Sequence, residues 1–234
     1  MIKLFFLFFI KECKVYLFYT NRSWFAVSFF LLCMLIFPLS LGSVDDLLRK
    51  TAVSSIWICA VFSNLISLEN LFKEDYDNGT LLQYKINQIP FSIIVITKCF
   101  SHWIFTGLPI ILLSPLFLVF LSGTSNNIVG LFFSLLCGTP LFSLIGMPVA
   151  ALTLGASTRG PLLIFLSIPF FLPIIIFGVL SVSSYNLGSY SEYYLLCAIL
   201  SICIVFLPYI TIKILIFCSF NVYFTPCPPH FLWP

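Results

Sequence analysis

Six long apolar segments constrain the fold of this chain more than any other feature of its sequence. Short polar stretches separate them, and they run over residues 23–42, 52–68, 91–121, 128–155, 161–181 and 193–217. A helix needs about 20 apolar residues to cross the hydrocarbon core of a bilayer, with a range of about 17–25. Each segment therefore predicts one membrane-spanning helix. The third is long enough to contain a kink or break at Pro109 and Pro115.

Charged residues are too scarce for a water-soluble protein. They make up 8% of the 234 residues, against 61% hydrophobic residues, whereas a soluble domain carries about 25% charge. Backbone groups in lipid must be satisfied internally, which leaves helices or closed barrels, and these segments lack the alternation of barrel strands. We expect an all-α polytopic membrane protein with about six transmembrane helices. The net charge is only +3 and the basic residues form no extended patch, so no nucleic acid partner is expected.

Residues 1–22 predict an amphipathic helix that lies in the membrane interface. At about 100° per residue, Lys3, Lys11 and Lys14 fall within an arc of about 80°, while Leu, Phe and Ile cover most of the remaining surface. A ragged start to the first span is the alternative. The transmembrane domain is expected over 23–220, and residues 221–234 are expected to form a disordered tail.

Basic residues predict the orientation in the membrane. With six crossings, the N-terminus, the 69–90 and 156–160 loops and the C-terminus share one side. Nine basic residues lie on or near that side, and Arg49 and Lys50 lie on the other. Because loops rich in Lys and Arg stay inside, both termini should face the cytoplasm or matrix. The nine residues are Lys3, Lys11, Lys14, Arg22, Lys73, Lys85, Lys98, Arg159 and Lys213.

A polar segment at 69–88, which we name the elbow, interrupts this apolar pattern. Glu69 and Lys73 form an i, i+4 pair in the favourable order. Asn78 and Gly79 predict a helix stop, after which Thr80 can cap a second short helix. A helix–turn–helix projection of this kind suits docking to a separate ATPase, with acids as the polar rim and aromatic side chains as the anchor. A plain solvated loop is the alternative. The residues assigned to ATPase coupling are Glu69, Phe72, Lys73, Glu74, Asp75, Tyr76, Asp77 and Gly79.

An ordered set of short motifs covers about residues 45–215. They are Ile56-Trp57-Ile58-Cys59-Ala60, Leu71-Phe72-x-x-Asp75-Tyr76-x-x-Gly79-Thr80-Leu81, Lys98-x-x-x-His102-Trp103, Leu152-x-Leu154-Gly155 with Arg159-Gly160, and Leu166-x-Ile168-Pro169 followed by Pro173-Ile174-Ile175-Ile176-Phe177-Gly178. In kind and order, this set resembles the CcmB family of haem exporter subunits in cytochrome c maturation. Two positions depart from the family pattern: Leu82 stands where Glu is common, and Gly160-Pro161 replaces a Gly-Gly pair.

The resemblance implies an ABC-2-like transporter permease subunit rather than an enzyme. Its implied partners are a CcmA-like ATPase, CcmC-like and CcmD-like membrane subunits and the haem chaperone CcmE. The implied role is release of the haem-loaded chaperone, powered by ATP hydrolysis on the partner. The chain agrees with this division, because none of its eleven glycines is followed by Lys and it therefore has no P-loop.

His102 and Trp103 are candidates for a haem contact or for an anchor at the membrane interface, with Lys98 one turn earlier as a snorkelling base. No catalytic residue and no metal site are predicted, because the nine cysteines include no C-x-x-C pair. Haem is expected as a handled ligand only. The Phe-rich composition suggests an organelle-encoded protein of the mitochondrial inner membrane, with a bacterial inner membrane as the alternative. A hydrophobic subunit of a respiratory complex is the competing function, whereas an intramembrane enzyme would need larger outer loops.

Overall fold

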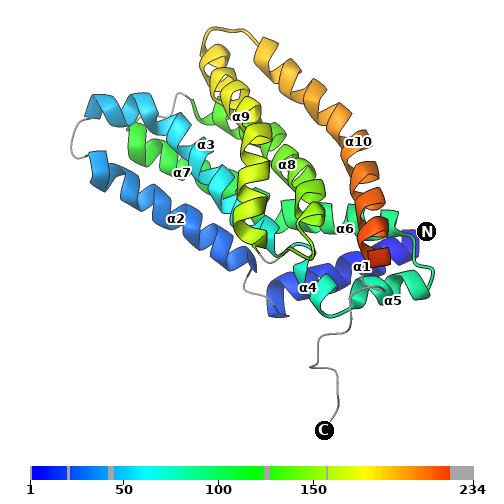
Figure 1. Ribbon diagram of the computed structural model, residues 1–234. Helices are drawn as coiled ribbons and strands as arrows, with labels where there is room; N and C mark the ends of the chain where they lie inside the picture. The colour runs from blue at the N-terminus through cyan, green and yellow to red at the C-terminus, as the bar shows by residue number, and fades with distance from the viewer. Residues whose placement is uncertain (1, 20–21, 42–44, 124–126, 157, 222–234) are drawn as a thin grey trace.

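The computed structural model describes residues 2–19, 22–41, 45–123, 127–156 and 158–221, and within these ranges it is helical with no strands. The predicted tail, apart from Asn221, lies outside the described residues. Figure 1 shows a bundle of long helices with short helices gathered at one end. The elements are α1 (Ile2–Lys14), a π-helical segment (Val15–Tyr19), α2 (Arg22–Leu41), α3 (Asp45–Glu69), α4 (Lys73–Asp77), α5 (Thr80–Ile86), α6 (Phe91–His102), a second π-helical segment (Trp103–Gly107), α7 (Leu108–Ser122), α8 (Ile128–Leu152), α9 (Arg159–Asn186) and α10 (Ser191–Asn221).

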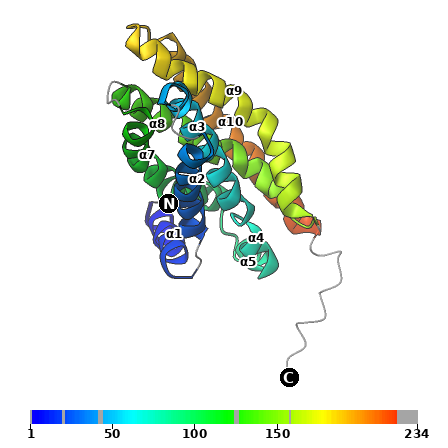
Figure 2. The same ribbon diagram turned by 90° about the vertical axis from the view of Figure 1, so that its left-hand side faces the viewer.

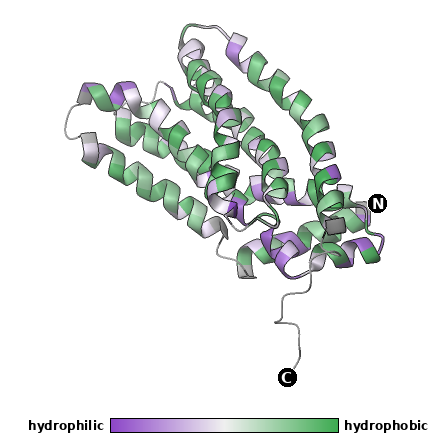
Figure 3. Ribbon diagram, in the orientation of Figure 1, coloured by the Kyte–Doolittle hydropathy of each residue, from purple (hydrophilic) through white to green (hydrophobic). Residues whose placement is uncertain are grey.

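The predicted all-α membrane fold is confirmed. Five helical stretches are long and apolar enough to cross a membrane, and Trp24–Ser40 in α2 is a shorter apolar helix at the position of the first predicted span. The five stretches are Asp46–Asp77, Phe91–Ser122, Ile128–Leu152, Arg159–Tyr185 and Ser191–Ser219. Apolar residues cover the long helices, and hydrophilic residues gather at their ends (Figure 3). The protein is therefore a multi-pass membrane protein.

Helix α3 organises the core because α2, α7, α8 and α9 all pack against it. Its Trp57 is fully buried, and the six-membered ring of the indole lies against the backbones of α8 and α9. Glycine makes this approach feasible: a Cβ atom on Gly138 or on Gly178 would lie 2.2 Å from the indole. Small residues allow helices in membranes to approach closely, and here they admit a tryptophan between two helices.

The short helices and the last turns of α10 meet at one end of the bundle, which we name the elbow end. Figures 1 and 2 show α1, α4, α5 and the last turns of α10 together there. Within the described residues, α1, the elbow and the end of the last span therefore share one end of the bundle. Which side of the membrane they occupy stays a prediction.

The third span does break, but earlier than expected. Its irregular part is the π-helical segment Trp103–Gly107, and α7 then continues through Pro115. Pro109 lacks an N–H and its ring crowds the carbonyl four residues back. A wider π turn just before it relieves that crowding. No break occurs at Pro115, where α7 continues, and a kink there stays a prediction.

Candidate partner-docking site

The elbow is a helix–turn–helix, as predicted. Helix α3 ends at Glu69, a short turn follows, and α4 and α5 meet at Gly79, which has the left-handed φ of +68° that glycine adopts without strain. Two local expectations were wrong. Thr80 is the first residue of α5 and its side chain makes no capping hydrogen bond. Glu69 is the last residue of α3 and Lys73 is the first residue of α4, so they do not form the predicted pair within one helix.

Arg159 fastens α4 to the loop that joins α8 to α9. Its Nη1 donates to Oδ1 of Asp77 at 3.0 Å, and its guanidinium lies 5.2 Å from the ring centroid of Tyr76. Gly155 in the same loop has a φ of +85° and lies beside the Tyr76 hydroxyl. The side chain of Asp77 is half-exposed and that of Arg159 is partly buried, so their ion pair contributes little stability by itself. Its value is geometric, because it fixes α4 against a second loop.

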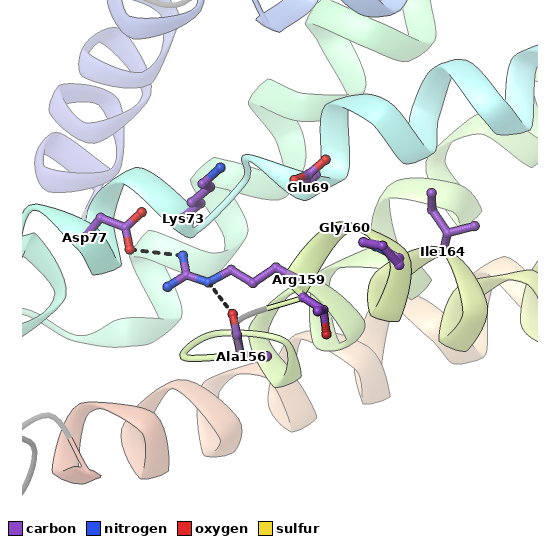
Figure 4. Close-up of a pocket in the computed structure, with 9 residues that line it drawn as sticks. Glu69, Lys73, Asp77, Ala156, Arg159, Gly160 and Ile164 are labelled. Carbon is purple, nitrogen blue, oxygen red and sulfur yellow. Dashed lines mark hydrogen bonds and ion pairs between the residues drawn. The ribbon is translucent and has the colours of Figure 1, made fainter.

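A polar pocket of about 650 Å³ lies between the elbow and this loop (Figure 4). Glu69, Lys73 and Asp77 approach it from the elbow, and Thr158 and Arg159 approach it from the loop and the start of α9. The Glu69 carboxylate lies about 3 Å from where a Cβ on Gly160 would be, next to the first turn of α9. Negative charge is favoured at a helix N-terminus. Two chain segments thus form one polar surface at the elbow end.

A second set of charges is buried behind α4. Nζ of Lys98 in α6 lies 2.7 Å from Oδ2 of Asp75, 3.2 and 3.3 Å from the two carboxylate oxygens of Glu12, and 3.2 Å from the carbonyl oxygen of Leu71. The side chains of Lys98 and Glu12 are each 4% exposed and that of Asp75 is 14% exposed. The expected snorkelling of Lys98 to the membrane interface is therefore wrong, because the carboxylates of α1 and α4 hold it inside.

These contacts divide the predicted coupling residues into two groups. Phe72 is fully buried and Asp75 faces Lys98, so neither presents its side chain to a docking partner. Their expected roles as docking anchor and rim are wrong for this structure. Asp77 is exposed, and Glu69, Lys73, Glu74, Tyr76 and Gly79 are partly exposed.

Helix α1 is attached to the elbow as well. Lys11 donates a hydrogen bond to the Tyr84 hydroxyl, and Phe8 packs edge-on against the Tyr84 ring at 5.6 Å between centroids. Burial raises the pKa of Tyr84, and the negative charge of Asp75 raises it further, against the lowering effect of Lys11. The phenol therefore stays neutral at physiological pH. The interfacial position predicted for α1 stays a prediction.

His102 and Trp103 lie in the bundle. His102 is fully buried, and its Nδ1 is 2.8 Å from the Ser143 hydroxyl in α8. Trp103 donates from Nε1 to the Thr139 hydroxyl at 3.0 Å and lines an apolar groove between α6, α8 and α10. The interface-anchor role is wrong for His102, because its ring has no exposed surface. A haem contact at His102 would likewise require the bundle to open.

Comparison with known proteins gives the family. The sequence profile of the CcmB protein matches residues 3–216. The chain belongs to the CcmB family. Curated relatives named heme exporter protein B are similar to it: the protein of Pseudomonas aeruginosa is 38% identical over 150 residues, which are 64% of this chain and 67% of that protein. That of Haemophilus influenzae is 41% identical over 150 residues, 64% of this chain and 68% of that protein, and that of Rhodobacter capsulatus is 37% identical over 152 residues, 65% and 70%.

Sequence reasoning on this CcmB-family chain missed two residues of the site. Glu12 falls within the predicted interfacial helix and has no role there, although it is an acid between Lys11 and Lys14. Arg159 enters the prediction only as one of the nine basic residues and within a motif, with no role in the site. A signal was available for Lys98, because an ionisable residue within an apolar span generally has a partner inside the protein.

Proposed function

We propose that this chain is the membrane permease subunit of an ABC-type haem exporter in cytochrome c maturation. The profile match over residues 3–216 carries the proposal, since it covers nearly all of the chain. The relatives' name, heme exporter protein B, supports export of haem, and release of a haem-loaded chaperone is the finer role that the family resemblance implies. The family assignment also decides against a respiratory-complex subunit. Further partners would be CcmC-like, CcmD-like and CcmE-like proteins, in a bacterial or mitochondrial inner membrane.

A separate CcmA-like ATPase would dock at the elbow end. The polar surface there combines α4 with the loop before α9, and Asp77, Glu69, Lys73 and Arg159 line it (Figure 4). It mixes both charge signs, as the rim of a protein interface does. Ile86, the last residue of α5, is 64% exposed and offers an apolar contact elsewhere on the elbow. These features support docking at the part of the elbow that internal contacts leave accessible.

The test is co-purification of the partner ATPase with a tagged chain. Asp77→Lys should reduce ATPase recovery at least several-fold, because it reverses the charge at an exposed position of the surface that the partner would meet. Asp46→Lys is the matched control, since Asp46 is an exposed aspartate at the opposite end of α3. Membrane insertion and yield should equal those of the wild type in both variants.

A charge swap separates docking from internal support. Asp77→Arg combined with Arg159→Asp restores the ion pair but reverses the surface. Recovery that stays low in the swap supports docking through Asp77. Full recovery in Asp77→Lys, or restoration by the swap, would contradict a direct contact between Asp77 and the ATPase.

A further inference from the structure

Lys98 joins three parts of the chain through one ammonium group. Glu12 brings α1, Asp75 brings α4, and the Leu71 carbonyl brings the turn between α3 and α4. A lysine ammonium has three N–H groups, and three acceptor groups surround this one. We name Lys98, Glu12 and Asp75 the charge joint.

The charge joint resists separation because of where it lies. The side chains of Lys98 and Glu12 are almost completely buried, and Asp75 is the most accessible of the three at 14%. Removing any partner from the ammonium would leave a carboxylate in a weakly polar interior, which is costly. The aromatic rings of Phe9 and Phe100, 5.7 Å apart, and of Phe8 and Tyr84 add apolar contacts on both sides of α1. Helices α1, α4 and α6 are therefore held as one unit.

Helix α6 continues this unit into the bundle. One turn after Lys98, His102 contacts Ser143, and Trp103 contacts Thr139, both in α8. The π-helical segment Trp103–Gly107 follows at once, and single π turns are common at functional sites in helices. Movement of α4 would thus reach α6 and the π-helical segment through Lys98.

We propose that Lys98 is a positioning residue that transmits displacement of the elbow to α1 and α6. This inference rests on the proposed function, because the displacement would come from the docked ATPase. Exposed elbow residues make the docking contact, while the buried charge joint carries the movement inward. Loss of the joint should leave docking intact and abolish the transmitted movement.

The experiment measures distances between spin labels in the complex with its co-expressed ATPase. Two label pairs share a reference at Leu187→Cys, which is highly exposed at the end of α9: one partner is Gln83→Cys on α5 and the other is Leu7→Cys on α1, both exposed. The background has its native cysteines replaced and retains ATPase recovery. In this background, a non-hydrolysable ATP analogue should shift both distances.

The decisive variant neutralises the joint without leaving a buried charge unpaired: Lys98→Met with Glu12→Gln and Asp75→Asn. Uncharged residues of similar volume avoid the cost of an unpaired buried charge, so this variant should fold and recover the ATPase like the wild type. Its α5 distance should still shift with the analogue, and its α1 distance should not. Lys98→Arg, which keeps the charge, should retain both shifts. An α1 shift of wild-type size in the neutral variant would overturn the inference.

Further outcomes separate the two proposals. If the ATPase binds and the α5 distance shifts while α1 stays still in the wild type, transmission is wrong and docking stands. If the ATPase does not bind, the proposed docking fails, and the isolated chain still tests the joint. There, the distance distribution between Leu7→Cys and Gln83→Cys should be narrow in the wild type and broad in the neutral variant, and equal widths would overturn the inference.

Discussion

The close packing of Trp57 against Gly138 of α8 and Gly178 of α9 can be tested quantitatively. Replacement of Gly138 by Ala would place a methyl carbon 2.2 Å from the Trp57 ring, whereas carbon atoms in contact lie about 3.5 Å or more apart. The indole would have to move by about 1.3 Å, the difference between these two distances. It has little room, because it is fully buried, Gly178 lies equally close on α9, and Phe142 packs edge-on at 5.9 Å between ring centroids. Overpacking of this kind costs about 1–3 kcal/mol.

Whether Gly138→Ala destabilises or stabilises the protein should depend on the side chain at position 57. In a Trp57→Leu background the space is open, and Gly138→Ala should be neutral or stabilising by up to about 1 kcal/mol from helix propensity. The coupling between the two positions is then about 1–4 kcal/mol. At about 2–4 °C per kcal/mol, it corresponds to a difference of roughly 2–16 °C in melting temperature between the two backgrounds.

The assay is thermal aggregation of the detergent-solubilised, tagged protein, followed by size-exclusion chromatography. Gly130→Ala is the matched control in the same helix, because its Cβ would meet the Cβ and ring of Tyr185 at 3.2–3.3 Å, and a shift of a few tenths of an ångström relieves such a contact. Equal destabilisation by Gly138→Ala in the wild-type and Trp57→Leu backgrounds would refute the steric account of this packing.

Two further predictions concern contacts between spans. Ser143→Ala removes the hydroxyl that lies beside Nδ1 of His102, and it should lower the free energy of unfolding by about 0.6 kcal/mol, up to about 1.7 kcal/mol. The control is Ser40→Ala, at an exposed serine that bonds only within α2, and it should leave the melting temperature unchanged. Equal melting temperatures of the two variants would contradict a supporting role for Ser143. The sulfur atoms of Cys137 in α8 and Cys197 in α10 lie 3.7 Å apart, so iodine should oxidise the two thiols to an intramolecular disulfide. The product is detected by intact mass in a chain whose other cysteines are replaced, with Cys197→Ser as the negative control. Absence of the disulfide would show that α8 and α10 do not lie together as described.

The spans and the elbow could be predicted from the sequence because their signals are local. About twenty apolar residues in a row predict a span wherever its neighbours lie, and Gly79 favours a turn by its own conformational freedom. The inward direction of Phe72 and Asp75 depends instead on which side of the short helix α4 faces α6. That choice is set by Lys98, which comes later in the chain than the elbow, and by Glu12, which lies in the first helix.

Residue type alone does not show whether a lysine near the end of a span is exposed or buried. A lysine near the end of a span can reach water or can meet a buried acid, and the sequence contains both arrangements without distinguishing them. Lys213 in α10 is exposed beside Tyr209, whereas Lys98 is enclosed. The difference arises because α1 and α4 bring acids to α6. Glu12, an acid among the lysines of α1, is the feature of the sequence that best indicates a partner for the lysine within the apolar span.

The contacts within the bundle also indicate where a force applied at the elbow would be felt. Ion pairs join α4 to Lys98 of α6 and to Arg159, the first residue of α9. Pulling α4 away from either helix would therefore separate paired charges. Helix α10 is different, since only 11% of its most apolar stretch is buried and the groove that it forms with α6 and α8 is lined mainly by apolar side chains. Because helices that share lipid-exposed apolar surface slide at less cost than helices joined by buried charges, displacement of the elbow would move α6 before it moved α10.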